Sequence, residues 1–160
     1  YAGLMIDKTG KPKVIEFNCR FGDPETQPIM CRLESSLVLL VEAALAKALD
    51  KVEATWDPRP TVGVVIAAGG YPADYAKGDV IEGLDAAAQL EGKVFHAGTA
   101  LKDGQIVTAG GRVLCATAIG RTVEEAQQQA YRLAEKIRWN GSFYRNDIGY
   151  RAIARERGEK

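Results

Sequence analysis

Residues 51–60 carry two prolines, Pro58 and Pro60, and show no hydrophobic periodicity. Proline fixes φ and donates no backbone hydrogen bond, so such a stretch ends the regular structure on either side of it. It therefore predicts a boundary that divides the chain into two regions. We assign residues 1–55 to one incomplete domain, residues 60–153 to a second, and residues 154–160 to a polar tail.

The chain begins at Tyr1, without a methionine, and enters an apolar stretch at once, so we expect it to be a fragment of a longer protein. Its 21 basic and 21 acidic residues balance, which argues against a nucleic-acid or anionic-membrane surface. No apolar run approaches the ~20 residues of a membrane span. Three cysteines outside any CxxC pair indicate reduced thiols and a cytoplasmic location. A single histidine, His96, rules out a multi-histidine metal site.

The second region alternates short apolar segments with turns. Lys102-Asp103-Gly104 is typical of a hairpin turn, and we expect it to join two of the strands. Thr122 and Glu125 have the spacing of a capping box, which predicts a helix over 123–138. Together these features predict an α+β domain with a mostly antiparallel sheet and one long packing helix. The expected strands are 62–68, 94–98, 105–108 and 113–119, and the expected buried helix stripe is Val123, Ala126, Ala130, Leu133, Ala134 and Ile137.

The first region predicts a β-hairpin over 2–18, with a turn at 7–12. Asp23 and Pro24 are suited to the start of a helix, although Pro28 would make that helix short or force it to restart. Ser35 and Ser36 can cap a second helix that runs to about Asp50. Apolar residues recur on one side of that helix, so we expect this side to face a core. They are Leu37, Leu40, Val41, Ala44, Leu45 and Ala48.

The segment 14–20 carries the most informative chemistry. If it is extended, Glu16, Asn18 and Arg20 share one face of the strand. Ile15, Phe17 and Cys19 then lie on the other face and point into a core. A carboxylate and an amide oxygen at this spacing can reach one hard cation such as Mg²⁺. The guanidinium beyond them can pair with a phosphate or a carboxylate. Phosphoryl transfer needs this combination, although an edge strand with a solvated polar face fits the same three residues.

The stretch 16–27 resembles the signature of the glycinamide ribonucleotide synthetases (phosphoribosylamine–glycine ligases), which are ATP-grasp enzymes of purine biosynthesis. The resemblance continues, in order, through 67–72, 94–99, 110–114 and 145–149. It implies that residues 1–55 are the last part of the ATP-grasp catalytic core and that the family's small C-terminal domain follows. It also implies a reaction in which glycine is activated by ATP as glycyl phosphate. The amine of 5-phosphoribosylamine then attacks, giving glycinamide ribonucleotide, ADP and phosphate.

Carried over residue by residue, the resemblance implies that Glu16 and Asn18 are ligands of Mg²⁺ or Mn²⁺. Arg20 would be the catalytic arginine that holds the reacting phosphate or carboxylate. Asp23 and Glu25 fall in the motif and would orient substrate or shape the loop. The family's grip on ATP lies upstream of Tyr1, so the expected partners are ATP, glycine, 5-phosphoribosylamine and the N-terminal part of the same enzyme. The fragment alone is expected to be inactive.

Two alternatives fit parts of the pattern. A different ATP-grasp carboxylate–amine ligase would share Glu16, Asn18 and Arg20, and a non-catalytic α+β interaction module would use them only to cover a sheet. A ligase requires the three side chains to line a cleft between the two regions. The sequence assigns no role to His96, to the turn at Gly69-Gly70, or to 110–112, which could be a turn with an exposed arginine or a substrate contact.

Overall fold

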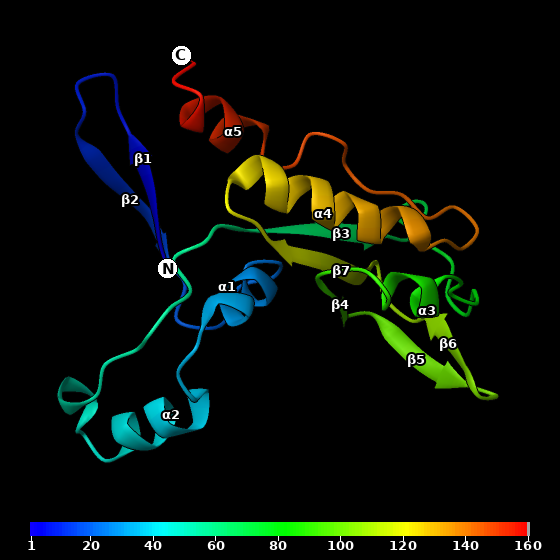
Figure 1. Cartoon of the computed structure of the whole chain (residues 1–160), viewed down its shortest axis with the longest axis horizontal. Helices are drawn as coiled ribbons and strands as arrows, with labels where there is room; N and C mark the ends of the chain where they lie inside the picture. Colours follow the sequence, from blue (N-terminus) through cyan, green and yellow to red (C-terminus); the bar gives the residue numbers. More distant parts are fainter. Residues whose placement is uncertain (160) are drawn as a thin grey trace.

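The computed structural model describes residues 1–159 as a mixture of helices and antiparallel strands (Figure 1). This confirms the predicted α+β class, and Lys160, the last residue of the expected polar tail, lies outside the described residues. The strands are β1 (Ala2–Ile6), β2 (Pro12–Phe17), β3 (Thr61–Ala67), β4 (Lys93–His96), β5 (Thr99–Lys102), β6 (Gln105–Thr108) and β7 (Arg112–Ile119). The helices are α1 (Thr26–Arg32), α2 (Leu37–Leu45), the 3-10 helix η1 (Leu49–Lys51), α3 (Leu84–Ala87), α4 (Val123–Lys136) and α5 (Tyr150–Glu156).

The central sheet has the strand order β3-β7-β4, and both pairings are antiparallel. Val65 of β3 and Phe95 of β4 both lie opposite Cys115 of β7. β7 is buried at every position from Val113 to Ala118, which explains its continuous run of apolar and small residues. A strand of this kind needs cover on both of its faces.

Helix α4 covers one face of the sheet (Figure 1). Its buried residues are Ala126, Ala130, Leu133 and Ala134, which follow the 3.6-residue helical period. They pack into the main core with Val64, Ile66 and Val113 of the sheet. The predicted stripe on this helix is therefore confirmed, although the helix ends at Lys136 rather than at Arg138.

Helix α1 covers the opposite face, where it contacts β3 and β7. Gly63 shows how closely it approaches. A Cβ atom at that position would lie 3.0 Å from Cγ of Pro28 and 3.1 Å from Sγ of Cys115. The sheet is thus the middle of three layers, and its outer layer on this side comes from the first region of the chain (Figure 1).

The start of α1 differs from the prediction made from Asp23 and Pro24. The helix begins at Thr26, with Glu25 at the N-cap position. Pro28 is therefore the third helical residue. The first amide groups of a helix have no intrahelical acceptor, so a proline is tolerated there.

The hairpin that uses the Asp103-Gly104 turn is a different one from that expected. β6 pairs with β5 (Thr99–Lys102), whereas β4 pairs with β7. Asp103 and Gly104 have φ values of +50° and +77°, as a type I′ turn requires. The turn was predicted correctly, but its incoming strand is the four-residue segment that follows Gly98 rather than 94–98.

The N-terminus of α4 is capped twice. Oγ1 of Thr122 accepts a hydrogen bond from the backbone N–H of Glu125, and the carboxylate of Glu156 accepts one from that of Val123. The expected capping box is incomplete, because the carboxylate of Glu125 accepts from the backbone N–H of Arg121. Glu156 ends α5, so this helix extends into the tail that we predicted as simply polar.

Helix α2 is capped by Ser36 as predicted, but it ends at Leu45 rather than near Asp50. Lys47 has a φ of +55°, a left-handed conformation that terminates helices. None of the residues of α2 is buried, and Leu45 is 81% exposed. The expectation that the apolar stripe of this helix faces a core is therefore wrong for residues 1–159. Within those residues, no helix is long and apolar enough to cross a membrane.

Candidate functional site

The hairpin β1–β2 presents the residues of the expected site at its open end. The hydroxyl of Tyr1 donates a hydrogen bond to Oε1 of Glu16 at 3.0 Å. Backbone hydrogen bonds join Tyr1 and Asn18 in both directions, at 2.8 and 2.9 Å. The carboxylate of Glu16 and the backbone at Asn18 are therefore fixed by Tyr1, the residue that precedes β1.

The expected extended segment does not reach Arg20. β2 ends at Phe17, and Oδ1 of Asn18 then accepts a hydrogen bond from the backbone N–H of Arg20 at 3.0 Å. This short-range side-chain bond turns the backbone, as asparagine often does. The register of the hairpin also shifts, because Gly3 pairs with Glu16 whereas Leu4 pairs with Val14. Ile15 is thus an extra residue, and simple alternation does not hold along the strand.

Cys19 is exposed, and so are Ile15 and Phe17. The expectation that these three side chains face a core is wrong for the described residues. Phe17 is 71% exposed, and other large apolar side chains of the hairpin are exposed with it. Figure 1 shows the hairpin extending away from the three-stranded sheet, so nothing in residues 1–159 covers it.

Arg20 is exposed, and only one nitrogen of its guanidinium donates a hydrogen bond among the described residues. Its Nη1 donates to the backbone oxygen of Phe21 at 2.9 Å, whereas Nε and Nη2 form no hydrogen bond among the described residues. Arg20 lines a groove of about 430 Å³ together with Tyr1, Cys19, Gly22 and Glu25. All the lining residues belong to the first region, and neither Glu16 nor Asn18 is among them. The expectation that Glu16, Asn18 and Arg20 together line a cleft between the two regions is therefore not met within residues 1–159.

The loop after Arg20 is folded tightly on itself. The backbone oxygen of buried Gly22 accepts hydrogen bonds from the N–H and the hydroxyl of Thr26. The carboxylate of Glu25 lies over the α-carbon of Gly22, in the space that a side chain at that position would need. Gly22 and Glu25, two positions of the motif, are therefore in contact in space.

Asp23 meets a residue that the sequence placed far away. Nη1 of Arg112, at the start of β7, lies 2.9 Å from the backbone oxygen of Asp23 and 3.3 Å from its Oδ2. The sequence singled out 110–112 as a turn with an available arginine, but nothing in the spacing indicated this partner. A cavity of about 360 Å³ lies beside the contact, between Pro24 of the loop and side chains of the second region that include Tyr71, Arg112, Phe143 and Tyr144.

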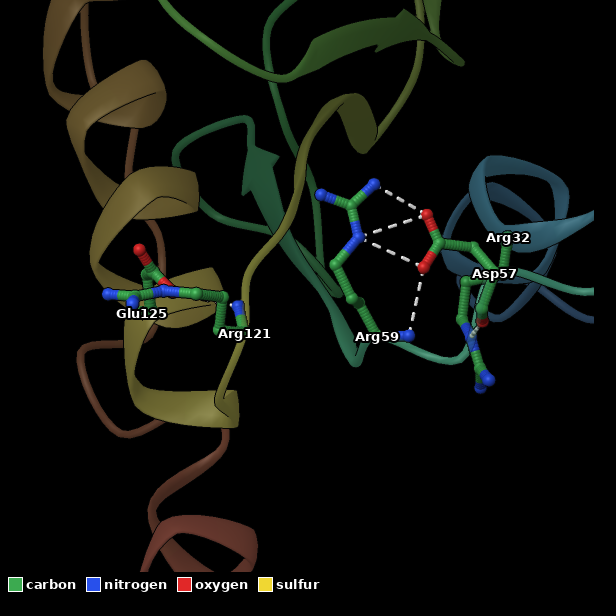
Figure 2. Close-up of polar contacts among 5 residues, drawn as sticks. All are labelled: Arg32, Asp57, Arg59, Arg121 and Glu125. Atoms are coloured by element: carbon green, nitrogen blue, oxygen red, sulfur yellow. Dashed lines mark hydrogen bonds and ion pairs between the residues drawn. The ribbon is translucent and has the colours of Figure 1, made fainter.

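The proline-containing segment 51–60 is held against α1 rather than left free. Nε of Arg32 donates to the backbone oxygen of Asp57 at 2.9 Å, and the N–H of Asp57 donates back to the oxygen of Arg32 at 2.8 Å. Figure 2 shows that the guanidinium of Arg59 binds the side-chain carboxylate of Asp57, with Nη2 2.6 Å from Oδ2. The hydrogen bonds from Arg59 hold the pKa of Asp57 at about 2, below its ordinary value of 3.8.

The donors at the end of the hairpin suit a hard divalent cation. Glu16 offers a carboxylate with one oxygen that accepts no hydrogen bond within residues 1–159, and Oδ1 of Asn18, which already accepts one bond, has a second lone pair. No cluster of three or more acidic, histidine or cysteine residues that could hold a metal occurs within residues 1–159. An ion held here would need further ligands from substrate phosphates, water or other protein segments, which is how Mg²⁺ is usually bound.

The positions left without a role make local contacts. Nδ1 of His96 lies 3.1 Å from the hydroxyl of Thr99, on the surface. Gly70 has a φ of +96° in a turn that the backbone N–H of Tyr71 closes onto Ala68. These contacts explain the two positions by local geometry alone.

Comparisons with known proteins match two parts of the chain. The family model described as "Phosphoribosylglycinamide synthetase, C domain" matches residues 61–151, and the model described as "Phosphoribosylglycinamide synthetase, ATP-grasp (A) domain" matches residues 1–26. The fold and these two matches define the chain as part of an ATP-grasp protein.

Similar whole proteins carry the same description. The phosphoribosylamine–glycine ligase of Pseudomonas aeruginosa is 89% identical over 159 residues, which are 99% of this chain and 37% of that protein. The enzyme of Salmonella typhimurium is 64% identical over 98% of this chain and 37% of its own length. The crystal structure of phosphoribosylamine–glycine ligase from Thermotoga maritima matches with a TM-score of 0.70 at 39% identity, over 91% of this chain and 35% of that one.

The C-domain match covers more than half of the chain, and the chain belongs to the phosphoribosylglycinamide synthetase family. It spans about 37% of the length of the relatives that it matches. These matches favour this family over a different ATP-grasp ligase and over a non-catalytic interaction module.

Proposed function

We propose that this chain is the C-terminal part of a cytoplasmic, ATP-dependent ligase that joins 5-phosphoribosylamine to glycine and yields glycinamide ribonucleotide, ADP and phosphate. The observation that carries the proposal is the family match on both sides of residues 51–60, together with the polar groups at the end of the hairpin. The names of the relatives state the same activity for those proteins.

In this proposal, Glu16 and Asn18 hold a divalent cation, Mg²⁺ or Mn²⁺. Such an ion, when bound, screens the negative charge of phosphate oxygens. Arg20 contributes through Nε and Nη2, which form no hydrogen bond among residues 1–159 and are exposed to a groove. A guanidinium in that state can grip two oxygens of a phosphate or a carboxylate. Asp23 and Glu25 shape the loop that carries Arg20 into the site.

The chemistry has two steps. A carboxylate oxygen of glycine attacks the γ-phosphorus of ATP, the bond between that phosphorus and the bridging oxygen breaks, and ADP leaves. The amine of 5-phosphoribosylamine then attacks the carbonyl carbon of glycyl phosphate and loses a proton, and phosphate departs as the carbon–oxygen bond breaks. Arg20 is placed to stabilise charge on the transferring phosphoryl group or on the carboxylate that it joins.

Glu16→Gln in the full-length ligase tests the metal assignment. It keeps the shape of the side chain and the bond from Tyr1 but removes the charge. We expect turnover to fall on the order of a hundredfold or more, with a higher Mg²⁺ requirement. Glu135→Gln, which removes an exposed carboxylate from α4, is the matched control and should match the wild type. Wild-type turnover of Glu16→Gln at ordinary Mg²⁺ would contradict the assignment.

A second measurement tests where ATP is gripped. We expect this 160-residue chain to show no micromolar affinity for ATP by isothermal titration calorimetry, because the grip is assigned to the part of the ligase that precedes residue 1. The full-length ligase is the positive control. Micromolar binding by the chain alone would place the nucleotide site within residues 1–160 and would refute this part of the proposal.

A further inference from the structure

We infer that Arg112 is a positioning residue that locks the loop 22–25, and with it Arg20, against the second region of the chain. The contact between Arg112 and the loop is observed in the structure, whereas its effect on turnover rests on the proposed function. Nη1 of Arg112 reaches the backbone oxygen of Asp23 at 2.9 Å and Oδ2 at 3.3 Å, across 89 positions of sequence. One guanidinium therefore binds both the backbone and the side chain of a residue three positions after Arg20.

Arg112 is itself held firmly. Its guanidinium carbon lies 5.7 Å from the ring centroid of Tyr71, within the range of a cation–π contact. The ring of Tyr71 occupies the space beside Gly111, where a Cβ atom would lie 2.8 Å from its Cε2. On the other side, a Cβ atom at Gly98 would lie 2.6 Å from the backbone oxygen of Arg112. The backbone is thus confined on both sides before the side chain reaches the loop.

The loop depends on contacts of this kind because its own side chains bury little. Phe21, Asp23 and Glu25 are all exposed. The bonds from Thr26 to Gly22 fix the shape of the loop, but they join it only to α1. The contact with Arg112 is the hydrogen bond that ties the loop directly to the sheet among the described residues, and it adds to the hold that the packing of α1 on β3 and β7 gives the loop.

The same contact borders the 360 Å³ cavity, since Pro24, Tyr71 and Arg112 all line it. Release of the loop would therefore change the wall of this cavity as well as the position of Arg20. Catalysis of group transfer is sensitive to displacements of about 1 Å, which can cost on the order of a hundredfold in rate. Arg112 acts through the loop and need not touch substrate to affect turnover.

The test uses the full-length ligase with the variants Arg112→Ala and Arg112→Lys. Arg112→Ala should lower kcat at least about tenfold and leave the KM for ATP unchanged, because it displaces the loop and not the upstream nucleotide grip. Arg112→Lys keeps the charge and one hydrogen bond, so we expect it to recover part of kcat. Arg138→Ala is the control: it removes an exposed arginine whose ion pair, at 3.0 Å, is with Glu82 and not with the loop, and it should behave as the wild type.

Hydrogen exchange measured by mass spectrometry on the same proteins separates the contact from the activity. We expect faster exchange in peptides covering 20–26 of Arg112→Ala and no change in peptides of α4. Unchanged exchange in peptides covering 20–26 would overturn the inference. Exchange that also rises throughout α4 would overturn it as well, because the substitution would then have destabilised the whole fold. If the wild-type ligase made no glycinamide ribonucleotide, the proposed function would fail, and the exchange result would still decide whether Arg112 holds the loop.

Discussion

Arg59 binds Asp57 through both carboxylate oxygens, with Nε 3.0 Å from Oδ1 and Nη2 2.6 Å from Oδ2 (Figure 2). Asp57 also accepts through its backbone oxygen from Arg32, so one residue joins the end of α1 to Arg59, which lies two residues before β3. This is a structural junction, and its electrostatics give it a dependence on pH.

Asp57 should contribute to acid stability. Its pKa is about 2 in the folded chain and 3.8 ordinarily, so folding favours the ionised carboxylate. The contribution is complete above pH ~4 and is lost as the pH falls from about 4 to about 2. Thermal unfolding followed against pH should therefore show a steeper loss of Tm below pH 4 in the wild type than in Asp57→Asn. Equal slopes would contradict this, and Asp85→Asn, which removes an exposed carboxylate, is the control.

Leu133 should be the costliest truncation on α4. It is 1% exposed and lies in the core between α4 and the sheet. Leu133→Ala removes three carbons and leaves a cavity, so we expect about 2–5 kcal/mol less stability in urea unfolding. Its neighbour Arg132 is exposed, and Arg132→Ala should change stability by less than about 0.5 kcal/mol. Similar losses in the two variants would mean that Leu133 is not in the core.

A substitution at Gly63 tests how closely α1 packs on the sheet. A Cβ atom there would be 3.0 Å from Cγ of Pro28, so Gly63→Ala should push the helix from the sheet and cost about 1–3 kcal/mol. The double variant Gly63→Ala with Pro28→Ala removes the obstructing ring and should be less destabilised than the sum of the single variants. A double-mutant cycle in urea measures this coupling. Strict additivity would show that the two residues do not meet.

Thr122 tests the cap of α4. Thr122→Ala leaves the backbone N–H of Glu125 without its acceptor and should cost about 1 kcal/mol. Thr122→Ser keeps the hydroxyl and should cost much less. Chemical denaturation of the three proteins checks the prediction, and an equal loss in the alanine and serine variants would indicate that the methyl group, and not the cap, matters.

The second region was predictable where a local pattern and a tertiary contact agree. Thr122, followed by apolar residues at helical spacing, defines α4 without knowledge of the sheet. The Asp103-Gly104 turn was also recognisable, because few residues accept positive φ. Its partner strand was not, since Thr99–Lys102 has only four residues, two of them polar, and its pairing depends on which strands β7 has already taken.

The first region was less predictable because its side chains face outward in this chain. The apolar residues of α2 and of the hairpin carry the periodicity of buried elements, yet they are exposed among residues 1–159. The path through Asn18 was missed for another reason: a single side-chain bond to the N–H of Arg20 outweighs strand propensity there. The contact between Arg112 and Asp23 had no signal at all, since it joins a loop to the start of β7 across 89 positions.

Because α1 packs on one face of the central sheet, the folded domain includes residues that precede the C-domain match at 61–151. A fragment that begins at residue 61 would lack α1, and the face of the sheet around Gly63 and Cys115 would be exposed to solvent. Anyone who isolates that piece for biophysical work should expect it to self-associate or to lose cooperativity, and should begin the excision before Thr26 instead.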